Sequence, residues 1–392
     1  MSGAANGPGA APGGAAGGGG LPDSAQRAGA EWLSGRGAHA DVVISSRVRL
    51  ARNLAGFPFL CRASREQRTR VLDIARRRLT TTGIAERVLW VDVHRAPPLD
   101  RTLMLERHLI SKEHARGVAL PAQGAATDAG AAGGEPRGVA VALPDESASV
   151  MVNEEDHLRI QVVKPGLELG AAFEAANRVD DALEGECEFG TLEYAYSQRF
   201  GFLTACPTNV GTGIRVSVML HLPALKLMGE MDKVRRATRD MGLAVRGYYG
   251  EGSEAAGEFY QVSNQTTLGK PEPAILRELE QEIVPQVIEY ERASRRLLLE
   301  KRRRMLEDKV FRSLGTLRGA RLLTPEEAVV LLSDVRLGVL AGLVPDIQAQ
   351  TVNQLVLLTQ PAHLQRVLGR ELDQGERREA RADFVRKVLG GN

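Results

Sequence analysis

Residues 45–53 read SSRVRLARN and directly follow the apolar run Val42–Ile44. Successive side chains of a strand point to opposite faces, so Arg47 and Arg49 would share one face if this stretch is extended. A guanidinium is permanently charged and carries its donors in a fixed fork that fits phosphate oxygens. The stretch therefore predicts a strand that presents arginines to an anion.

Other polar segments lie beside predicted strands further along the chain, and they contain Arg159, Arg215 and Arg246. A single strand arginine is usually a solvated or paired surface residue. Five arginines on one sheet face would instead suit a polyanion such as the phosphates of ATP. The segments are RHLIS (107–111), NEEDHLR (153–159), CPTNVGTGIR (206–215), RGYYGEGS (246–253) and SNQTTLG (263–269).

The apolar pattern predicts an α+β fold with one large antiparallel sheet flanked by helices, followed by a helical C-terminal domain. From Pro271 onward apolar residues repeat at helical spacing, with Pro285 as a kink and helix continuing through 295–314. Thr324 and Pro325 predict the start of another helix. The expected division is a disordered Gly/Ala-rich tail at 1–30, a sheet domain at 31–270 with a flexible insertion at 123–136, and a helical domain at 271–392.

Composition excludes several classes of protein. The net charge of +2 and 4% aromatic residues give no general reason to expect nucleic-acid binding. Three widely spaced cysteines form neither a disulfide framework nor a zinc pattern. No signal peptide or membrane-length apolar run is present, so we expect a soluble cytoplasmic protein without a membrane partner. P-loop, HRD and DFG motifs are also missing, so any ATP site belongs to a different nucleotide fold.

The polar segments together resemble the ATP:guanido phosphotransferases, or phosphagen kinases, and most of all the bacterial protein-arginine kinases. NEEDHLR, CPTNVGTGIR and RGYYGEGSE are long, specific strings, and their order matches the family. The resemblance is strong over residues 41–269 and weaker through the helical domain. It implies that 31–270 is a catalytic domain that uses ATP and Mg²⁺.

The resemblance also implies roles for individual residues. Glu155 and Glu251 fall on the two catalytic carboxylates, and Cys206 on the reactive cysteine beside the guanidinium. The nucleotide-binding positions are Ser45, Ser46, Arg47, Val48, Arg49, His108, Arg159, Arg215, Val216, Ser217, Val218, Met219, Arg246, Gly247, Tyr248, Tyr249, Gly250 and Glu251. No protein metal site is implied, because phosphates and waters hold Mg²⁺.

Phosphoryl transfer to an arginine guanidinium needs carboxylates and arginines of this kind. An arginine side chain stays protonated (pKa above about 12), so its nitrogen attacks poorly until a proton leaves. Two carboxylates can orient the guanidinium and accept that proton, while arginines stabilise the transferring phosphoryl group. Simpler interpretations exist for each residue. The acidic run 154–156 could be a solvated turn, Cys206 a small buried side chain, and His108 and His157 structural hydrogen-bonding groups.

The predicted acceptor is the arginine of a protein. Phosphagen kinases for free arginine or creatine carry a helical domain of about one hundred residues before the SSRVR-like segment, whereas about forty residues precede it here. In the bacterial protein-arginine kinases, phosphoarginine marks proteins for Clp protease degradation under stress. The implied partners are proteins with exposed arginines, a Clp ATPase-protease, an activator protein and a second copy in a homodimer.

Those kinases also carry a C-terminal RDxxRA motif that forms a phosphoarginine pocket. Residues 377–382 read RREARA here, so Arg378 replaces the aspartate. Arg377 and Arg381 lie four apart and would share a helix face able to clamp a phosphoryl group. A solvated helix face, with Phe384 and Val385 inward, is the alternative.

Three other functions compete with this prediction: a free-arginine phosphagen kinase, a non-catalytic phosphoarginine-binding adaptor and a nucleic-acid-binding protein. The short N-terminal segment argues against the free-arginine kinase. The retained carboxylates, cysteine and arginines argue against the non-catalytic adaptor. The third would use the basic run 295–304, but its charges alternate with Glu300, Glu307 and Asp308, which favours an exposed helix face or a subunit contact.

Overall fold

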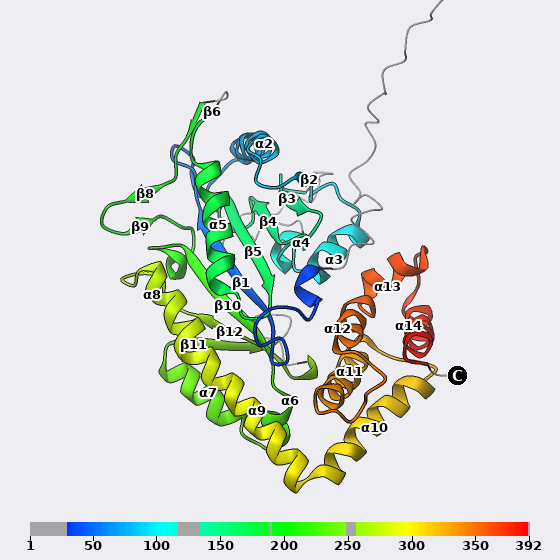
Figure 1. Ribbon diagram of the computed structural model, residues 1–392. Helices are drawn as coiled ribbons and strands as arrows, with labels where there is room; N and C mark the ends of the chain where they lie inside the picture. The colour runs from blue at the N-terminus through cyan, green and yellow to red at the C-terminus, as the bar shows by residue number, and fades with distance from the viewer. Residues whose placement is uncertain (1–29, 117–133, 188–189, 248–255, 391–392) are drawn as a thin grey trace, which may run out of the picture.

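An eight-stranded sheet forms the frame of the first half of the protein (Figure 1). The computed structural model describes residues 30–116, 134–187, 190–247 and 256–390. Every neighbouring pair of strands in this sheet is antiparallel, which confirms the predicted fold class. In order across the sheet, the strands are β11 (Leu243–Gly247), β12 (Phe259–Asn264), β10 (Ile214–His221), β1 (Val43–Arg52), β5 (Leu158–Pro165), β4 (Ala148–Val152), β3 (Gly138–Leu143) and β2 (Arg87–Val91).

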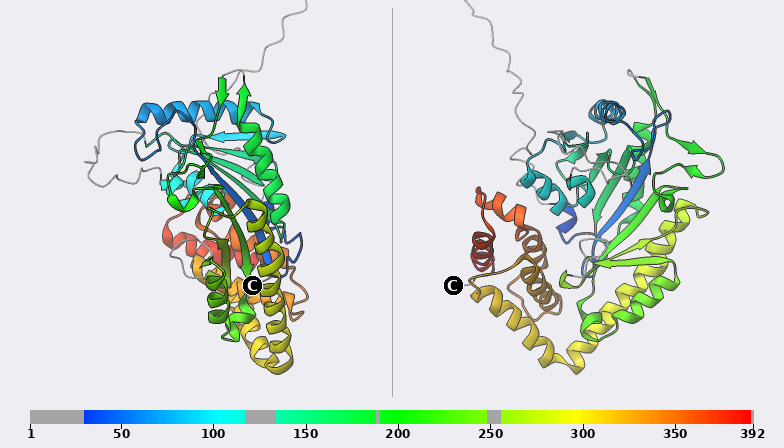
Figure 2. Two further views of the ribbon diagram at one scale, coloured as in Figure 1. Left: turned by 90° about the vertical axis from the view of Figure 1, so that its left-hand side faces the viewer. Right: turned by 180° about the vertical axis from the view of Figure 1, so that it is seen from behind.

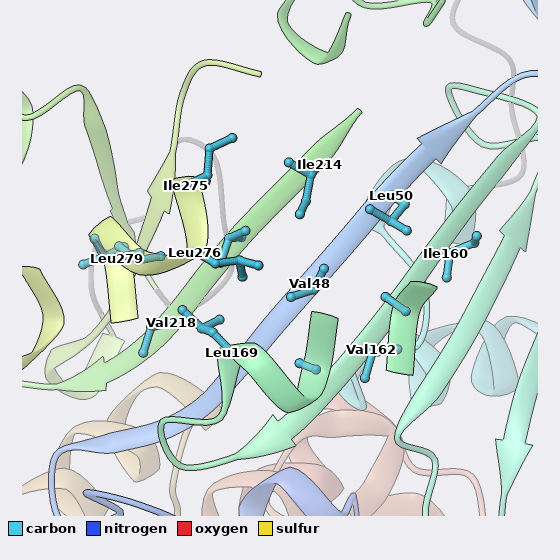
Figure 3. Close-up of a cluster of buried hydrophobic side chains, with 14 of the residues drawn as sticks. Val48, Leu50, Ile160, Val162, Leu169, Ile214, Val218, Ile275, Leu276 and Leu279 are labelled. Carbon is cyan, nitrogen blue, oxygen red and sulfur yellow. The ribbon is translucent and has the colours of Figure 1, made fainter. Parts of the chain in front are cut away.

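One face of the sheet is apolar because alternate residues of the central strands are aliphatic. Figure 3 shows aliphatic side chains of β1, β5 and β10 meeting Leu169 of helix α5 (Leu169–Leu183). Ile275 and Leu276 of α8 (Glu272–Arg277) and Leu279 of the π-helical turn η4 (Glu278–Ile283) complete the layer. Burying each such side chain stabilises the fold by about 1.5–3 kcal/mol. These helices cover one face and leave the other for polar groups.

Shorter elements surround the sheet. Helix α2 begins with a capping box, in which the Ser64 hydroxyl accepts from the Gln67 amide and the Gln67 side chain accepts from the Ser64 amide. The other elements are η1 (Glu31–Leu33), α2 (Arg65–Thr81), α3 (Pro98–Glu106), α4 (Lys112–Arg116), β6 (Gly185–Cys187), β7 (Gly190–Leu192), β8 (Tyr196–Ser197), β9 (Gly201–Phe202), η2 (Pro207–Asn209), α6 (Pro223–Leu227), α7 (Met231–Asp240) and η3 (Ala256–Glu258).

The second half is helical, as predicted, and Figures 1 and 2 show its first two long helices meeting in a V. The uninterrupted helix expected over 295–314 is wrong. Helix α9 ends at Lys301, Arg302 has a non-helical backbone (φ −135°, ψ 31°), and α10 begins at Arg303. No Gly or Pro marks this break, and Leu306 beyond it is buried in the helical core. The helices are α9 (Val284–Lys301), α10 (Arg303–Gly319), α11 (Pro325–Leu340), α12 (Ala349–Leu358), α13 (Pro361–Leu368) and α14 (Gln374–Leu389).

Two helix signals in the sequence are placed accurately. Thr324 caps α11 by accepting from the Glu327 amide at 3.1 Å, and Pro325 is the first helical residue. Pro285 lies in the first turn of α9, and the irregular backbone precedes it in η4. The proline therefore marks the restart of regular helix rather than a bend within it.

Some expected domain boundaries differ from the packing. Ile275, Leu279 and Ile288 belong to the core beneath the sheet, so the segment up to 288 packs with the first half and the boundary at 270 is too early. Ala30 and Pro136, expected at the ends of the tail and the insertion, are buried. Residues 1–29 and 123–133 lie outside the described residues. Within the described part of the chain, no helix is both long and apolar enough to cross a membrane.

Candidate active site

The polar face of the sheet gathers arginines from four strands. Arg47 and Arg49 of β1 are half-buried. Arg49 lies directly opposite Arg215 of β10, and Arg159 of β5 lies opposite Ala51, on the same face of β1. Arg246 of β11 lies opposite Gln261 of β12, which lies opposite Met219 of β10. Met219 in turn lies opposite Ser45 of β1, so Arg246 is on the same face as Arg47. The structure therefore brings together the five arginines that the sequence placed on one face.

These guanidinium groups repel one another. Burial, with the charges of Arg215, Arg159 and Arg246, lowers the pKa of Arg47 to about 10. Burial, with the charges of Arg47, Arg159 and Arg215, also holds the pKa of Arg49 well below its usual value, against an opposing effect of Glu154. Arg49 Nε is buried and has no hydrogen-bond partner among the described residues. Buried like charges are costly unless an anion compensates them, so this face is suited to bind a polyanion.

Arg159 is held by both glutamates of the NEED segment. Its Nη1 lies 2.6 Å from Glu154 Oε2 and its Nη2 lies 2.6 Å from Glu155 Oε2. The Glu154 side chain is only 3% exposed, whereas that of Glu155 is 44% exposed. Burial tends to raise the pKa of Glu154, but Arg159 and the Ser111 hydroxyl keep that pKa below its usual range. Glu154 thus anchors Arg159, and Glu155 remains accessible to a substrate.

Sequence reasoning gave Glu154 no role. Two adjacent glutamates in a turn carry no periodicity that tells which one points inward, so only the fold separates the anchor from the exposed carboxylate.

The other residues of these segments lock the loops together. Asn53 Nδ2 donates to Asp156 Oδ1 at 2.7 Å, and the same oxygen accepts from the Ala205 amide at 2.7 Å. His157 Nδ1 accepts from the Leu54 amide at 3.0 Å. Asp156 and His157 therefore fix the loop that leads into residue 206, which agrees with a structural role for His157.

Cys206 lies at the end of that loop and is half-buried, with Sγ 3.0 Å from Thr208 Oγ1. Thr267 of the SNQTTLG segment braces the loop, because its hydroxyl lies 2.9 Å from the Thr208 carbonyl oxygen and 2.7 Å from that of Val210. Gly213 has φ 66°, and a Cβ there would lie 2.7 Å from the Ala51 carbonyl oxygen. The loop can approach β1 only because this residue is glycine.

A pocket lies at the Arg47 end of the polar face. Arg47 Nε donates to Ser217 Oγ at 3.3 Å. His108 has a positive φ of 61°, and its ring packs edge-on against Trp32, with centroids 5.0 Å apart. Burial and Arg47 lower the pKa of His108 to about 3, so its imidazole is neutral near pH 7. The lining residues are Trp32, Ser45, Arg47, His108, Val163, Ser217, Met219 and Gln261.

Other residues expected at the nucleotide point elsewhere. Val48, Val216 and Val218 are fully buried in the core beneath the opposite face. The Ser46 hydroxyl donates to the Gly166 carbonyl at 2.8 Å. Contiguous stretches of a strand cannot put every side chain on one face, so these four can serve a ligand only indirectly. Gly247 ends β11, and Tyr248, Tyr249, Gly250 and Glu251 lie outside the described residues.

Within the described ranges, no group of three or more His, Cys, Asp or Glu side chains is arranged to hold a metal ion. The donors that converge on the polar face are guanidinium groups, which suit phosphate and not a cation. This donor set fits a metal ion that is held by the phosphates of the nucleotide and by water.

The two arginines expected to clamp phosphoarginine are not equivalent. Arg377 lines a cavity of about 780 Å³ between α3, α13 and the start of α14, together with Thr102, Gln365 and Asp373. Arg381 is 1% exposed and donates to the carbonyl oxygens of Thr359 at 2.6 Å and Leu323 at 2.9 Å. Arg377 therefore faces this cavity, whereas Arg381 is buried and does not line it.

The basic run 295–304 is also divided. Arg295 is buried and bonds to Glu291 Oε1 at 2.9 Å, whereas Arg296 and residues 301–304 are exposed. Arg295 therefore belongs to the contact between α9 and the sheet half and could not contact a nucleic acid.

Comparison with known proteins agrees with this geometry. A family profile described as the ATP:guanido phosphotransferase C-terminal catalytic domain matches residues 71–294. The duplicated taurocyamine kinase from Schistosoma mansoni, solved with transition state analog components, has a TM-score of 0.54 and 26% identity, over 64% of this chain and 33% of that one. Lombricine kinase has a TM-score of 0.53 over 71% of this chain and 73% of that one, and at 24% identity this likeness concerns the fold alone. The chain therefore belongs to the ATP:guanido phosphotransferase family.

Within that family the likeness is to the protein-arginine kinases. The protein-arginine kinase of Symbiobacterium thermophilum is 46% identical over 366 residues, which cover 93% of this chain and 97% of that protein. That of Halothermothrix orenii is 41% identical over 360 residues, covering 91% and 96%. A profile described as the protein-arginine kinase McsB C-terminal domain matches residues 303–391, which begin directly after the helix break at Arg302.

Proposed function

We propose that this protein transfers the γ-phosphoryl group of ATP to arginine side chains of other proteins. The observation that carries the proposal is the half-buried set of five arginines that repel one another on the polar face, with the exposed carboxylate of Glu155 at its edge. Its curated relatives, named protein-arginine kinases, support protein arginine as the acceptor.

The arginines of the polar face would bind and orient the phosphates. Arg47, Arg49 and Arg215 lie on adjacent strands, and Arg159 is fixed from behind by Glu154. Because these charges are in place before the substrate binds, they can stabilise negative charge on the transferring group without reorganisation. Mg²⁺, held by the phosphates, would supply further charge neutralisation.

Glu155 would serve the acceptor. One of its oxygens contacts Arg159, and its side chain is exposed at the edge of the arginine set. A carboxylate there can align an incoming guanidinium and take the proton that its attacking nitrogen loses. We propose that Glu251 is the second carboxylate and that Cys206 contacts the guanidinium, as the family resemblance implies.

The remaining expectations form part of the same proposal. We propose a cytoplasmic enzyme that acts in protein quality control under stress, supplies a Clp ATPase-protease with marked proteins, responds to an activator and forms a homodimer. These roles rest on the resemblance to protein-arginine kinases.

The direct test is incubation with Mg-ATP and an unfolded protein, followed by mass spectrometry at neutral pH, because the N–P bond is labile in acid. Free arginine is the parallel acceptor, and Glu155→Gln is the matched control for catalysis. We expect phosphoarginine in the protein and little turnover of free arginine. Robust turnover of free arginine with none in protein would favour a phosphagen kinase, and turnover of neither would refute both.

A further inference from the structure

Trp32 has a buried polar atom without a partner. It lies in the turn η1, before the first strand, and is 4% exposed. Its indole Nε1 is buried and forms no hydrogen bond with any described residue. A buried donor left unsatisfied costs roughly 1–3 kcal/mol, and buried tryptophans usually find an acceptor. The other tryptophan, Trp90, does so, because its Nε1 donates to Asp92 Oδ1 at 2.8 Å.

The surroundings of Trp32 indicate what could supply the acceptor. Trp32 lines the pocket at the Arg47 end of the polar face, where its ring meets the neutral imidazole of His108. Val163 and Met219 provide apolar walls, and Gln261 provides an amide. Apolar and aromatic side chains with a few polar groups are the usual lining of a small-molecule site.

The position of the pocket relative to the arginines fits this assignment. Arg47 lines the pocket and also repels Arg159, Arg215 and Arg246 across the polar face. A triphosphate bound by the arginines would therefore end beside the pocket, and the attached nucleoside would enter it.

The turn that carries Trp32 is itself held in place. Asn353 of α12 donates a hydrogen bond from Nδ2 to the Leu33 carbonyl oxygen at 3.4 Å. Asn353 is fixed in turn by Arg336 of α11, whose Nε donates to Asn353 Oδ1 at 2.8 Å. The helical half thus supports the wall of the pocket that Trp32 forms.

We propose that Trp32 recognises the base of the bound nucleotide, with its indole N–H donating to a ring nitrogen of the purine and its ring forming one wall of the base site. This inference rests on the proposed use of ATP. It adds a residue that precedes the sheet and that the sequence did not single out.

The test compares Trp32→Phe, which keeps an aromatic wall but removes the N–H, with Trp90→Phe. Affinities for Mg-ATP and for inorganic tripolyphosphate, which has no base, are measured for both variants and the wild type. Trp32→Phe should bind Mg-ATP roughly 3- to 10-fold more weakly, the effect of one neutral hydrogen bond. Its affinity for tripolyphosphate should not change, and Trp90→Phe should bind both ligands as the wild type does.

The chain has two tryptophans, so Trp32 is the only one left in Trp90→Phe. Its fluorescence should change when Mg-ATP saturates the protein and should not change with tripolyphosphate. This measurement decides the question even if Trp32→Phe fails to fold. Unchanged fluorescence with Mg-ATP, unchanged ATP affinity in Trp32→Phe, or an equal loss of affinity for both ligands would overturn the inference. A wild type that binds neither ligand would instead refute the proposed function.

Discussion

Arg107 donates a hydrogen bond from Nε to His363 Nε2 at 3.1 Å and so joins the sheet half of the protein to helix α13. His363 Nδ1 lies 2.7 Å from Glu106 Oε2, and Arg107 Nη1 lies 2.5 Å from Glu146 Oε1. Burial lowers the pKa of His363, so the neutral ring can donate to Glu106 and accept from Arg107. The residue that follows Arg107 is His108, which lines the pocket beside Arg47.

His363 lies in the helical half of the protein, and replacing it should weaken ATP binding at the sheet. We expect His363→Ala to raise KM for ATP several-fold with little change in KM for the protein acceptor. Arg366→Ala is the matched control, because Arg366 of α13 pairs with Asp100 of α3 at the same contact. Steady-state kinetics and thermal melting of both variants check this. Equal effects of the two changes on KM for ATP would mean that the contact is only structural.

The two adjacent glutamates should have separable effects. Glu155→Gln should lower kcat by about a hundredfold or more, the cost of losing an aligned base, and leave ATP affinity largely intact. Glu154→Gln should instead weaken ATP binding, because the buried anchor of Arg159 loses its charge. Nucleotide titration and single-turnover rates distinguish the two. The reverse pattern would exchange their roles, and near-normal turnover of Glu155→Gln would remove it from catalysis.

The arginine set should oppose stability until an anion binds. Arg49 is disfavoured by burial and by its neighbours, so Arg49→Met should raise the melting temperature of the protein without nucleotide. The same variant should lose most of the stabilisation that Mg-ATP gives the wild type. Differential scanning fluorimetry with and without Mg-ATP measures both effects. A lower melting temperature without nucleotide would show that Arg49 is already compensated within the protein.

Arg377 and Arg381 should differ because only Arg377 lines the cavity. Arg381→Ala should lower the melting temperature by several degrees, since it leaves buried carbonyl oxygens of Thr359 and Leu323 without this donor. Arg377→Ala should fold normally and lose any affinity for phosphoarginine. Calorimetric titration of phosphoarginine into Arg377→Ala and the wild type checks this, and identical binding would exclude Arg377 from such a site.

Acid should destabilise the protein through His114, a buried histidine close to Glu154. Burial lowers the pKa of His114 to about 4, whereas its unfolded value is near 6.5. Between these values the unfolded chain binds more protons than the folded one, so stability falls as pH drops from about 6.5 toward 4. His114→Gln should reduce this pH dependence in urea unfolding measured from pH 7 to 5. An unchanged slope would mean that other groups dominate.

The sequence sufficed where local pattern and tertiary structure agree. Alternation placed Arg47 and Arg49 on one face of β1, and the proline and threonine at 324–325 marked the start of α11. Prediction from the sequence failed where tertiary packing decides the structure. Nothing in the run around Arg302 breaks a helix locally, and the spacing of Arg377 and Arg381 defines a shared face without telling whether that face is exposed. Trp32 carried no motif, and its significance comes only from its missing partner.

The alternation of β1 has a further consequence for folding fidelity. Arg47 and Arg49 alternate with Val48 and Leu50, and β1 is paired on both sides, with β5 and with β10. A slip of one residue in either pairing would carry both guanidinium groups beneath α5 and expose the two aliphatic side chains. Such an error would place two uncompensated cations in the core, and the free-energy cost of burying them disfavours the misaligned state. The two arginines proposed to bind the anion therefore also disfavour a shifted strand register while the chain folds.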